Sequence, residues 1–139
     1  MKTFCTTRPL RFGDCDPTGI AYFPSYMNLL VGVTEDFFTS LGFGWRELAK
    51  NHSVVTPTVR LDVTFSRPGF QDDRIDFALS VVGVGRSSLD FVHTASVEGQ
   101  LLWRAEQRIV ATSAQSHRAC PWPDDLRAAL TTHLEPDNA

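Results

Sequence analysis

The sequence predicts an α+β fold in which one curved antiparallel sheet of about five strands wraps around one long central helix. The length of 139 residues and the 42% apolar content suit a single domain, residues 1–139, with one ordinary core. One stretch in the first half is apolar at helical spacing over most of its circumference. From about residue 54 onward, apolar and polar residues alternate in four consecutive segments. Wrapping the sheet around the helix buries both apolar surfaces.

The predicted central helix runs from Pro24 to about Leu41. Proline suits the first helical turn, and Gly42 is placed to end the helix. A narrow polar stripe lies on one side, and apolar residues cover most of the remaining circumference, so we expect other elements to surround this helix. The stripe is Asn28, Gly32, Glu35 and Thr39, and the apolar residues are Tyr26, Met27, Leu30, Val31, Val33, Phe37, Phe38 and Leu41.

The four alternating segments predict antiparallel strands with one apolar and one polar face. An N-terminal strand near residues 3–12 completes the sheet, a short helical piece covers about residues 45–50, and a short helix follows Pro123 with Asp124 or Asp125 as its cap. A turn is expected at residues 98–100. The four apolar faces are Val59, Leu61, Val63 and Phe65; Ile75, Phe77, Leu79 and Val81; Leu89, Phe91, Ala95 and Val97; and Trp103, Ala105, Ile109 and Ala111.

Charge and cysteine content exclude several classes of protein. The net charge is −3 with both signs spread along the chain, so neither nucleic acid nor an anionic membrane is an expected partner. Three distant cysteines without CxxC spacing argue against a disulfide framework or a zinc site and favour a reducing cytoplasm. The N-terminus has no apolar run of signal-peptide length, and no stretch approaches the roughly 18 apolar residues of a membrane span. The four histidines have no paired spacing, so no metal is expected.

The segment that carries chemistry is residues 12–26, FGDCDPTGIAYFPSY. Taken alone, its acids Asp14 and Asp16 could satisfy loop amides, because Asp-Pro sequences are common turn formers. The segment resembles the signature of the 4-hydroxybenzoyl-CoA thioesterase family of hotdog-fold enzymes. In that signature an acidic residue, a proline or small residue, a glycine and an aromatic pair precede the core helix. The order of elements agrees over nearly the whole chain.

The resemblance implies a hotdog fold and hydrolysis of an acyl-CoA thioester with Asp16 as the catalytic carboxylate. It also implies that the backbone amide of Phe23 polarises the thioester carbonyl, and that Gly19 and Tyr22 contact the substrate. A helix N-terminus presents unpaired amide donors, which stabilise an oxyanion and favour a nearby ionised carboxylate. Asp16 could attack the thioester carbon or deprotonate a water; the resemblance to aromatic-acyl members favours attack. Asp14 is expected to be structural.

A second informative segment follows the second of the four predicted strands, at residues 83–88, GVGRSS. It lacks the Walker pattern, so it could equally be a bulge or turn between strands. In similar thioesterases a basic residue followed by serine touches the phosphates of coenzyme A here, which implies that role for Arg86, Ser87 and Ser88. Because this chain offers one basic residue there, we expect the phosphate contact to be either weaker or shared with residues of a neighbouring subunit such as Arg60, Arg67 or Arg118.

Other positions bear on the acyl group. Thr56 and Thr58 resemble the family's pocket wall, although Pro57 between them could simply open a strand. Trp45 corresponds to an aromatic against the acyl pocket in relatives, and an ordinary core tryptophan is the alternative. Residue 31 is Val31, where a phenol-binding carboxylate would be expected for a 4-hydroxy substituent. This favours a less polar aryl or a medium-chain acyl group.

The sequence therefore predicts an acyl-CoA thioesterase that needs no cofactor other than the coenzyme A of its substrate. We expect a homo-oligomer, at least a dimer and by resemblance a tetramer, because a curved sheet with free edges is an aggregation hazard unless paired. Its site would lie between two chains. A non-catalytic acyl-CoA or acyl-carrier-protein binding module is the alternative, against which Asp16 argues. A hotdog dehydratase would need a histidine paired with an acid within residues 12–26, and a serine hydrolase a GxSxG motif; the chain has neither.

Overall fold

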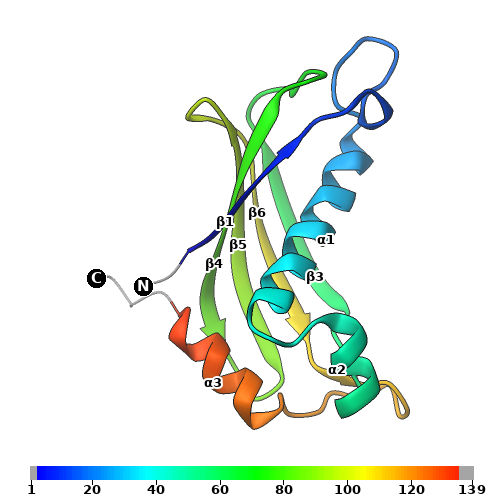
Figure 1. Cartoon of the computed structure of the whole chain (residues 1–139), viewed down its shortest axis with the longest axis vertical. Coiled ribbons are helices and arrows are strands. Elements are labelled where there is room, and N and C mark those ends of the chain that lie inside the picture. The colour runs from blue at the N-terminus through cyan, green and yellow to red at the C-terminus, as the bar shows by residue number, and fades with distance from the viewer. Residues whose placement is uncertain (1–2, 135–139) are drawn as a thin grey trace.

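The computed structural model describes residues 3–134 and contains one five-stranded antiparallel sheet in the order β1-β4-β5-β6-β3, with the long helix α1 lying along its inner face (Figure 1). The predicted hotdog architecture is confirmed. Within the described residues no helix is both long and apolar enough to cross a membrane. The elements are β1 (Phe4–Pro9), η1 (Phe12–Asp14), α1 (Phe23–Ser40), α2 (Trp45–His52), β2 (Val54–Val55), β3 (Thr58–Phe65), β4 (Arg74–Val84), β5 (Ser88–Val97), β6 (Gln100–Val110), β7 (Thr112–Ser113) and α3 (Asp124–Thr132).

Helix α1 forms where the apolar pattern predicts it. Pro24 occupies its first turn, and Gly42 follows the C-cap with a φ of +85°, a conformation that costs glycine little. The expectation that the helix is surrounded is wrong for a single chain, because Val31 is 47% exposed. The sheet ends at β3, so nothing in the described chain covers this side of the helix.

Strands β4, β5 and β6 present the predicted apolar faces to α1. Phe77, Phe91 and Trp103 each lie on this inner face and are almost completely buried. The predicted turn between β5 and β6 is confirmed at Glu98 and Gly99, whose φ angles of 50° and 78° are those of a tight type I′ hairpin. Contacts across this meander form the core on which α1 rests.

Strand β3 differs from the prediction at its start. A β-bulge interrupts its pairing with β6, so that Thr58 lies opposite the buried Ile109 and Leu61 opposite Gln107. Val59 is the extra residue of the bulge and is exposed. The inner face of β3 therefore begins with the hydroxyl of Thr58 and not with an apolar residue.

The C-terminal helix α3 begins one position away from the predicted cap. Pro123 is the N-cap residue, so Asp124 and Asp125 lie in the first turn and not at the cap. Proline fixes the extended conformation that precedes a helix, and the two carboxylates then suit the positive end of the helix dipole. Leu126 and Leu130 are buried and attach α3 to one end of the sheet.

His93 is a buried core histidine on β5, where it lies in phase with the buried Phe91 and Ala95. Its side chain is fully buried, and its Nε2 lies 2.9 Å from Oε1 of Gln107. Burial lowers the pKa of His93 from 6.5 to about 4, and the hydrogen bond with Gln107 opposes part of that shift. The imidazole is therefore neutral in the folded protein near neutral pH.

This buried histidine predicts an acid-sensitive stability. Below pH 6.5 the unfolded chain binds a proton at His93 that the folded protein excludes, so stability present above pH 6.5 is lost as the pH falls. We expect this group alone to lower the free energy of unfolding by about 3 kcal/mol at pH 4. Denaturant unfolding of wild type and His93→Gln across pH 4–7 measures the effect. His52→Gln, at an exposed histidine, is the control; equal pH slopes for wild type and His93→Gln would contradict it.

Candidate active site

The loop before α1 folds back on itself and fixes the position of Asp16 within it. The amide of Asp16 donates to the carbonyl of Ile20 at 2.9 Å, and the amide of Tyr22 donates to the carbonyl of Asp14 at 2.8 Å. Between them Cys15 and Ala21 form an isolated antiparallel bridge. The two arms of the loop are thus paired, which holds Asp16 opposite Ile20, three residues before the helix begins.

The carboxylate of Asp16 accepts its two short hydrogen bonds on one oxygen. Oδ1 accepts hydrogen bonds from both the amide of Thr18, at 2.8 Å, and its hydroxyl. The backbone amide of Ile20 also stabilises the carboxylate, more weakly than Thr18 does. The Thr18 hydroxyl, followed by the Thr18 amide, lowers the pKa of Asp16 below its ordinary value of 3.8. Asp16 is therefore ionised at neutral pH.

Thr18 is a residue that sequence reasoning missed. A hydroxyl residue two positions after an aspartate is the pattern of a local turn in which the aspartate accepts from the chain, so a signal was present. Asp14 uses its carboxylate differently: its Oδ2 accepts from the amide of Arg11 at 2.9 Å. Asp14 thus closes the short η1 turn, which is the structural use expected for it.

The start of α1 presents an unpaired donor beside a hollow. The amide of Phe23 has no hydrogen-bond acceptor within the described chain, as expected of a first helical residue. A shallow hollow of about 340 Å³ lies at this end of the helix and is lined by Ile20, Ala21, Phe23, Tyr26, Phe65, Ser66, Arg67 and Pro68. The Tyr26 hydroxyl accepts from the amide of Gly69 at 2.9 Å and fixes the far wall. Arg67 lies in this hollow, on the same chain as Phe23.

The neighbouring predicted residues Gly19 and Tyr22 also belong to this end of the molecule. Gly19 has a φ of +81°, which a side chain would strain, and its carbonyl accepts from the amide of Gln71 at 3.1 Å. Tyr22 precedes the helix with an exposed side chain. Together with Asp16 and Phe23 they form the first group of site residues, which we call the acid end.

The remaining predicted residues form a second group, which we call the turn end. Arg86 is exposed in the tight turn between β4 and β5, and the carbonyls of Arg86, Ser87 and Ser88 all accept hydrogen bonds from the segment around Ala111 and Trp122. Ser88 lies opposite Val110, whose amide donates to the carbonyl of Pro57. Thr56 and Thr58 flank that proline, so the turn and the start of β3 are neighbours.

The two groups lie at opposite ends of the chain. The acid end is at the top of Figure 1, beside the end of β3, where the rings of Phe23 and Phe65 are 6.3 Å apart. The turn end is at the bottom, beside the start of β3 and helices α2 and α3. Thr58 and Phe65 are the two ends of the eight-residue strand β3, seven positions apart, which is a span of about 23 Å. One chain therefore does not bring all the predicted site residues together.

Trp45 and Thr56 share a second, apolar hollow with Val54 and Val55 at the turn end. Trp45 is partly buried, its ring lies 6.3 Å from that of Phe38, and its indole N–H is buried without a partner in the described chain. It is thus both a core contact and a wall of this hollow; its role against an acyl group stays a prediction.

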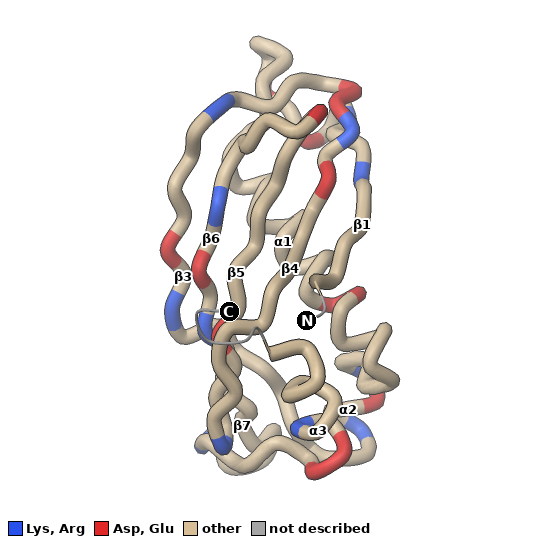
Figure 2. The backbone as a smooth tube through the Cα atoms, turned by 90° about the vertical axis from the view of Figure 1, so that its left-hand side faces the viewer, with Lys and Arg blue, Asp and Glu red and all other residues tan. Residues whose placement is uncertain are grey.

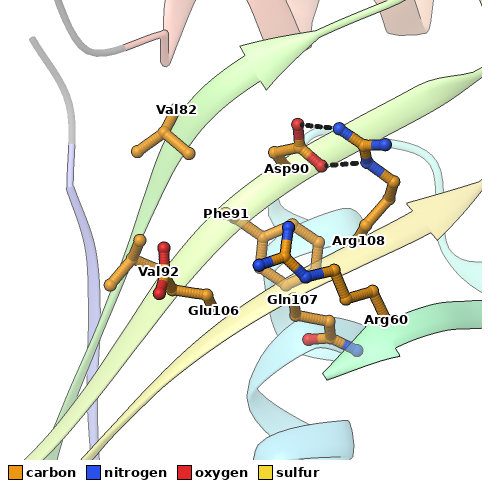
Figure 3. Close-up of a pocket in the computed structure, with 8 residues that line it drawn as sticks. All are labelled: Arg60, Val82, Asp90, Phe91, Val92, Glu106, Gln107 and Arg108. Atoms are coloured by element: carbon orange, nitrogen blue, oxygen red, sulfur yellow. Dashed lines mark hydrogen bonds and ion pairs between the residues drawn. The ribbon is translucent and has the colours of Figure 1, made fainter. Parts of the chain in front are cut away.

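A third pocket lies on the outer face of the sheet, away from α1 (Figure 3). Asp90 and Arg108 face one another there and form two contacts of 2.6 and 2.9 Å, and Arg60 extends from the neighbouring strand. The hydrogen bonds from Arg108 lower the pKa of Asp90. Figure 2 shows that basic and acidic residues are interspersed along β3 and β6. Arg60 thus lies among paired charges.

The hydrogen bonds from Thr18 predict the pH dependence of catalysis. They stabilise the charged form of Asp16, so replacing Thr18 with valine is expected to raise the pKa of Asp16 towards its ordinary value. If Asp16 must be ionised to react, the acid limb of kcat/KM should move to higher pH. Thr18→Ser keeps a hydroxyl and is the control. Thiol release measured between pH 3 and 7 tests this, and an unmoved acid limb in Thr18→Val would refute it.

Comparison with known proteins identifies the family. Residues 10–130 match the model of the Thioesterase-like superfamily. A 1,4-dihydroxy-2-naphthoyl-CoA hydrolase of Synechococcus elongatus is 26% identical over 128 residues, which cover 91% of this chain and 94% of the relative. A 4-hydroxybenzoyl-CoA thioesterase of a Pseudomonas species is 30% identical over 105 residues, covering 70% of this chain and 74% of the relative.

Solved structures agree with this match. A thioesterase superfamily protein of Jannaschia superposes with a TM-score of 0.89 at 25% identity and covers 96% of this chain and 94% of its own. A Staphylococcus aureus protein solved in complex with CoA gives a TM-score of 0.90 at 15% identity, covering 99% and 89%. The predicted enzyme class, an acyl-CoA thioester hydrolase, is confirmed. This chain belongs to the Thioesterase-like superfamily and has its hotdog fold.

Proposed function

We propose that this protein hydrolyses aromatic acyl-CoA thioesters at sites formed between two copies of the chain. The observation that carries the proposal is that one short loop holds an ionised carboxylate, whose short hydrogen bonds occupy only Oδ1, and leads directly into a helix that starts with an unpaired amide. The named relatives act on aromatic substrates, a dihydroxynaphthoyl-CoA and a hydroxybenzoyl-CoA, which supports an aromatic acyl group here. The apolar hollow beside Phe23 suits an aryl ring.

The residues of the acid end have complementary roles in this reaction. The Phe23 amide donates to the thioester carbonyl oxygen and stabilises the negative charge that develops there. Oδ2 of Asp16 attacks the thioester carbon, the carbon–sulfur bond breaks, and CoA leaves as a thiolate that takes a proton from solvent. Water then hydrolyses the mixed anhydride and restores Asp16. Alternatively, Asp16 removes a proton from a water that attacks the carbon directly.

A second copy of the chain supplies the turn end. Strand β3 is at the edge of the sheet, and apolar side chains on its inner face are exposed to solvent: Leu61 is 40% exposed and Phe65 48%. If two β3 strands pair antiparallel about a two-fold axis near the middle of residues 58–65, the start of one strand lies beside the end of the other. The turn end of one copy then faces the acid end of its partner, and the same contact covers Val31.

In this dimer each of two equivalent sites contains Asp16, Gly19, Tyr22 and Phe23 from one chain. Thr56, Thr58, Arg86, Ser87 and Ser88 come from the other and contact the acyl group or the phosphates of coenzyme A. Arg67 lies at the acid end and could share the phosphate contact from that side. A tetramer, a cytoplasmic location and the absence of any further cofactor stay predictions.

Thiol release from a panel of benzoyl-, hydroxybenzoyl-, naphthoyl- and medium-chain acyl-CoAs tests the proposal. We expect turnover with the aromatic thioesters. Their kcat/KM should be at least about tenfold higher than that of the medium-chain thioesters, because the named relatives of this chain act on CoA thioesters of aromatic acids. Tight binding of acyl-CoA without release of any thiol would instead identify a non-catalytic binding module.

A further inference from the structure

A chain of three polar side chains crosses the inner face of the sheet beneath otherwise apolar surroundings. His93 on β5 is fully buried, and its Nε2 lies 2.9 Å from Oε1 of Gln107 on β6. Nε2 of Gln107 donates in turn to Oγ1 of Thr58 at 2.8 Å. Gln107 is only 6% exposed, whereas Thr58 is exposed at the edge strand. The chain thus runs from the core to the free edge of the sheet.

The direction of these hydrogen bonds follows from the unpaired atom at the buried end. Nδ1 of His93 is buried and has no partner in the described chain. If Nε2 carries the proton, Nδ1 is left with a lone pair; in the other tautomer a buried N–H would be left unpaired, which is rarer in proteins. His93 therefore donates to Gln107, and the amide group of Gln107 donates to Thr58.

The direction of these hydrogen bonds determines where the hydroxyl proton of Thr58 points. A threonine hydroxyl has one donor and can accept two hydrogen bonds. Because Gln107 already supplies a donor from the buried side, the hydroxyl proton of Thr58 is left to point away from the core, towards whatever covers the edge of β3. If the side-chain amide of Gln107 were turned over, the Thr58 hydroxyl would donate its proton to the amide oxygen of Gln107. It could then only accept a hydrogen bond from a group outside the sheet.

We propose that His93 and Gln107 are positioning residues that orient the hydroxyl of Thr58 as a hydrogen-bond donor. The oriented hydroxyl selects acyl groups whose aromatic ring bears a hydrogen-bond acceptor. This rests on the proposed function, in which Thr58 of one chain faces the acyl site of the other. Val31 and Leu61, exposed on the same inner side, offer no polar group. Position 31 of this chain has no carboxylate to bind a ring substituent. Thr58 would then be the residue that contacts an oxygen substituent on the aromatic ring of the substrate.

The test measures substrate preference and not activity alone. For wild type and variants, kcat and KM are determined with benzoyl-CoA and with the hydroxybenzoyl- or methoxybenzoyl-CoA isomer that wild type hydrolyses best. We expect Thr58→Val to lower the ratio of kcat/KM for the substituted over the unsubstituted substrate about 3- to 10-fold, the effect of one hydrogen bond. Thr58→Ser, which keeps the hydroxyl, should retain the ratio within about twofold.

A second variant and a spectroscopic measurement test the positioning role. Gln107→Met keeps the side-chain length but removes both hydrogen bonds, so the ratio should fall in the same direction, and the double variant with Thr58→Val should fall no further than Thr58→Val alone. Nitrogen NMR of His93 in the wild-type protein should show the tautomer protonated at Nε2. This measurement needs no variant to fold.

The outcomes separate this inference from the proposed function. A ratio unchanged in Thr58→Val, an equal loss with both substrates, or a His93 protonated at Nδ1 would overturn the positioning role and leave thioester hydrolysis intact. Failure of the wild-type protein to release thiol from any aromatic thioester would overturn the proposed function instead.

Discussion

Replacing Asp16 with asparagine is expected to lower kcat for thiol release by at least about 100-fold, while acyl-CoA binding persists. The change removes the negative charge and the nucleophilic or basic oxygen at Oδ2, and a positioned acid–base group typically contributes 10²- to 10⁴-fold. It keeps the side-chain shape and an oxygen that can still accept from Thr18. Thiol release under saturating substrate, together with equilibrium binding of the acyl-CoA, measures both effects.

Asp14→Asn is the matched control for this variant. Asp14 lies in the same loop and carries the same charge, but its Oδ2 is used to accept from the amide of Arg11, which an asparagine oxygen can also do. We expect it to keep turnover within a few-fold of wild type. Equal rates for Asp16→Asn and Asp14→Asn would remove Asp16 from the mechanism.

The second large effect is expected from a charge on the exposed inner face of β3. Leu61→Lys puts a positive charge beside the midpoint of the strand, where a two-fold axis would place it near its own copy. We expect a monomer whose turnover is at least about 100-fold lower, because each chain would hold only half of each site. Size-exclusion chromatography, circular dichroism and thiol release follow the oligomer, the fold and the activity.

Thr64→Lys provides the same charge on the same strand but on its outer face, since Thr64 lies opposite the exposed Arg104. We expect this control to remain a dimer with turnover close to wild type. A fully active monomer of Leu61→Lys would show that one chain completes the site, contrary to the proposed arrangement.

Much of the fold could be predicted because its patterns are local. The apolar spacing and Gly42 define α1, and the Glu98-Gly99 pair defines the turn between β5 and β6. Neither signal depends on the rest of the chain. The bulge at Val59 could not be predicted, because it arises from how β3 pairs with β6. The exposure of Val31 was missed for a related reason: the sequence shows that a surface is apolar, not which chain covers it.

In the candidate site, too, the residues of one continuous motif could be predicted from the sequence, and those brought together from different strands could not. Asp16 and Phe23 belong to one continuous motif, so the sequence places them together, and the loop pairing between Asp16 and Ile20 gives that motif its shape. Gln107 carries no local signal, because its role depends on His93 and Thr58, which come from two other strands. Contacts between distant strands are set by the register of the whole sheet.

The most direct test of a site shared by two chains is complementation between two inactive proteins. One carries Asp16→Asn, which disables the acid end, and the other carries Thr58→Val with Arg86→Glu, which disables the turn end. After subunit exchange, half of the dimers would be mixed, and each would contain one site with two intact halves. We predict recovery of about a quarter of wild-type thiol release; a mixture no more active than its separate components would contradict the shared site.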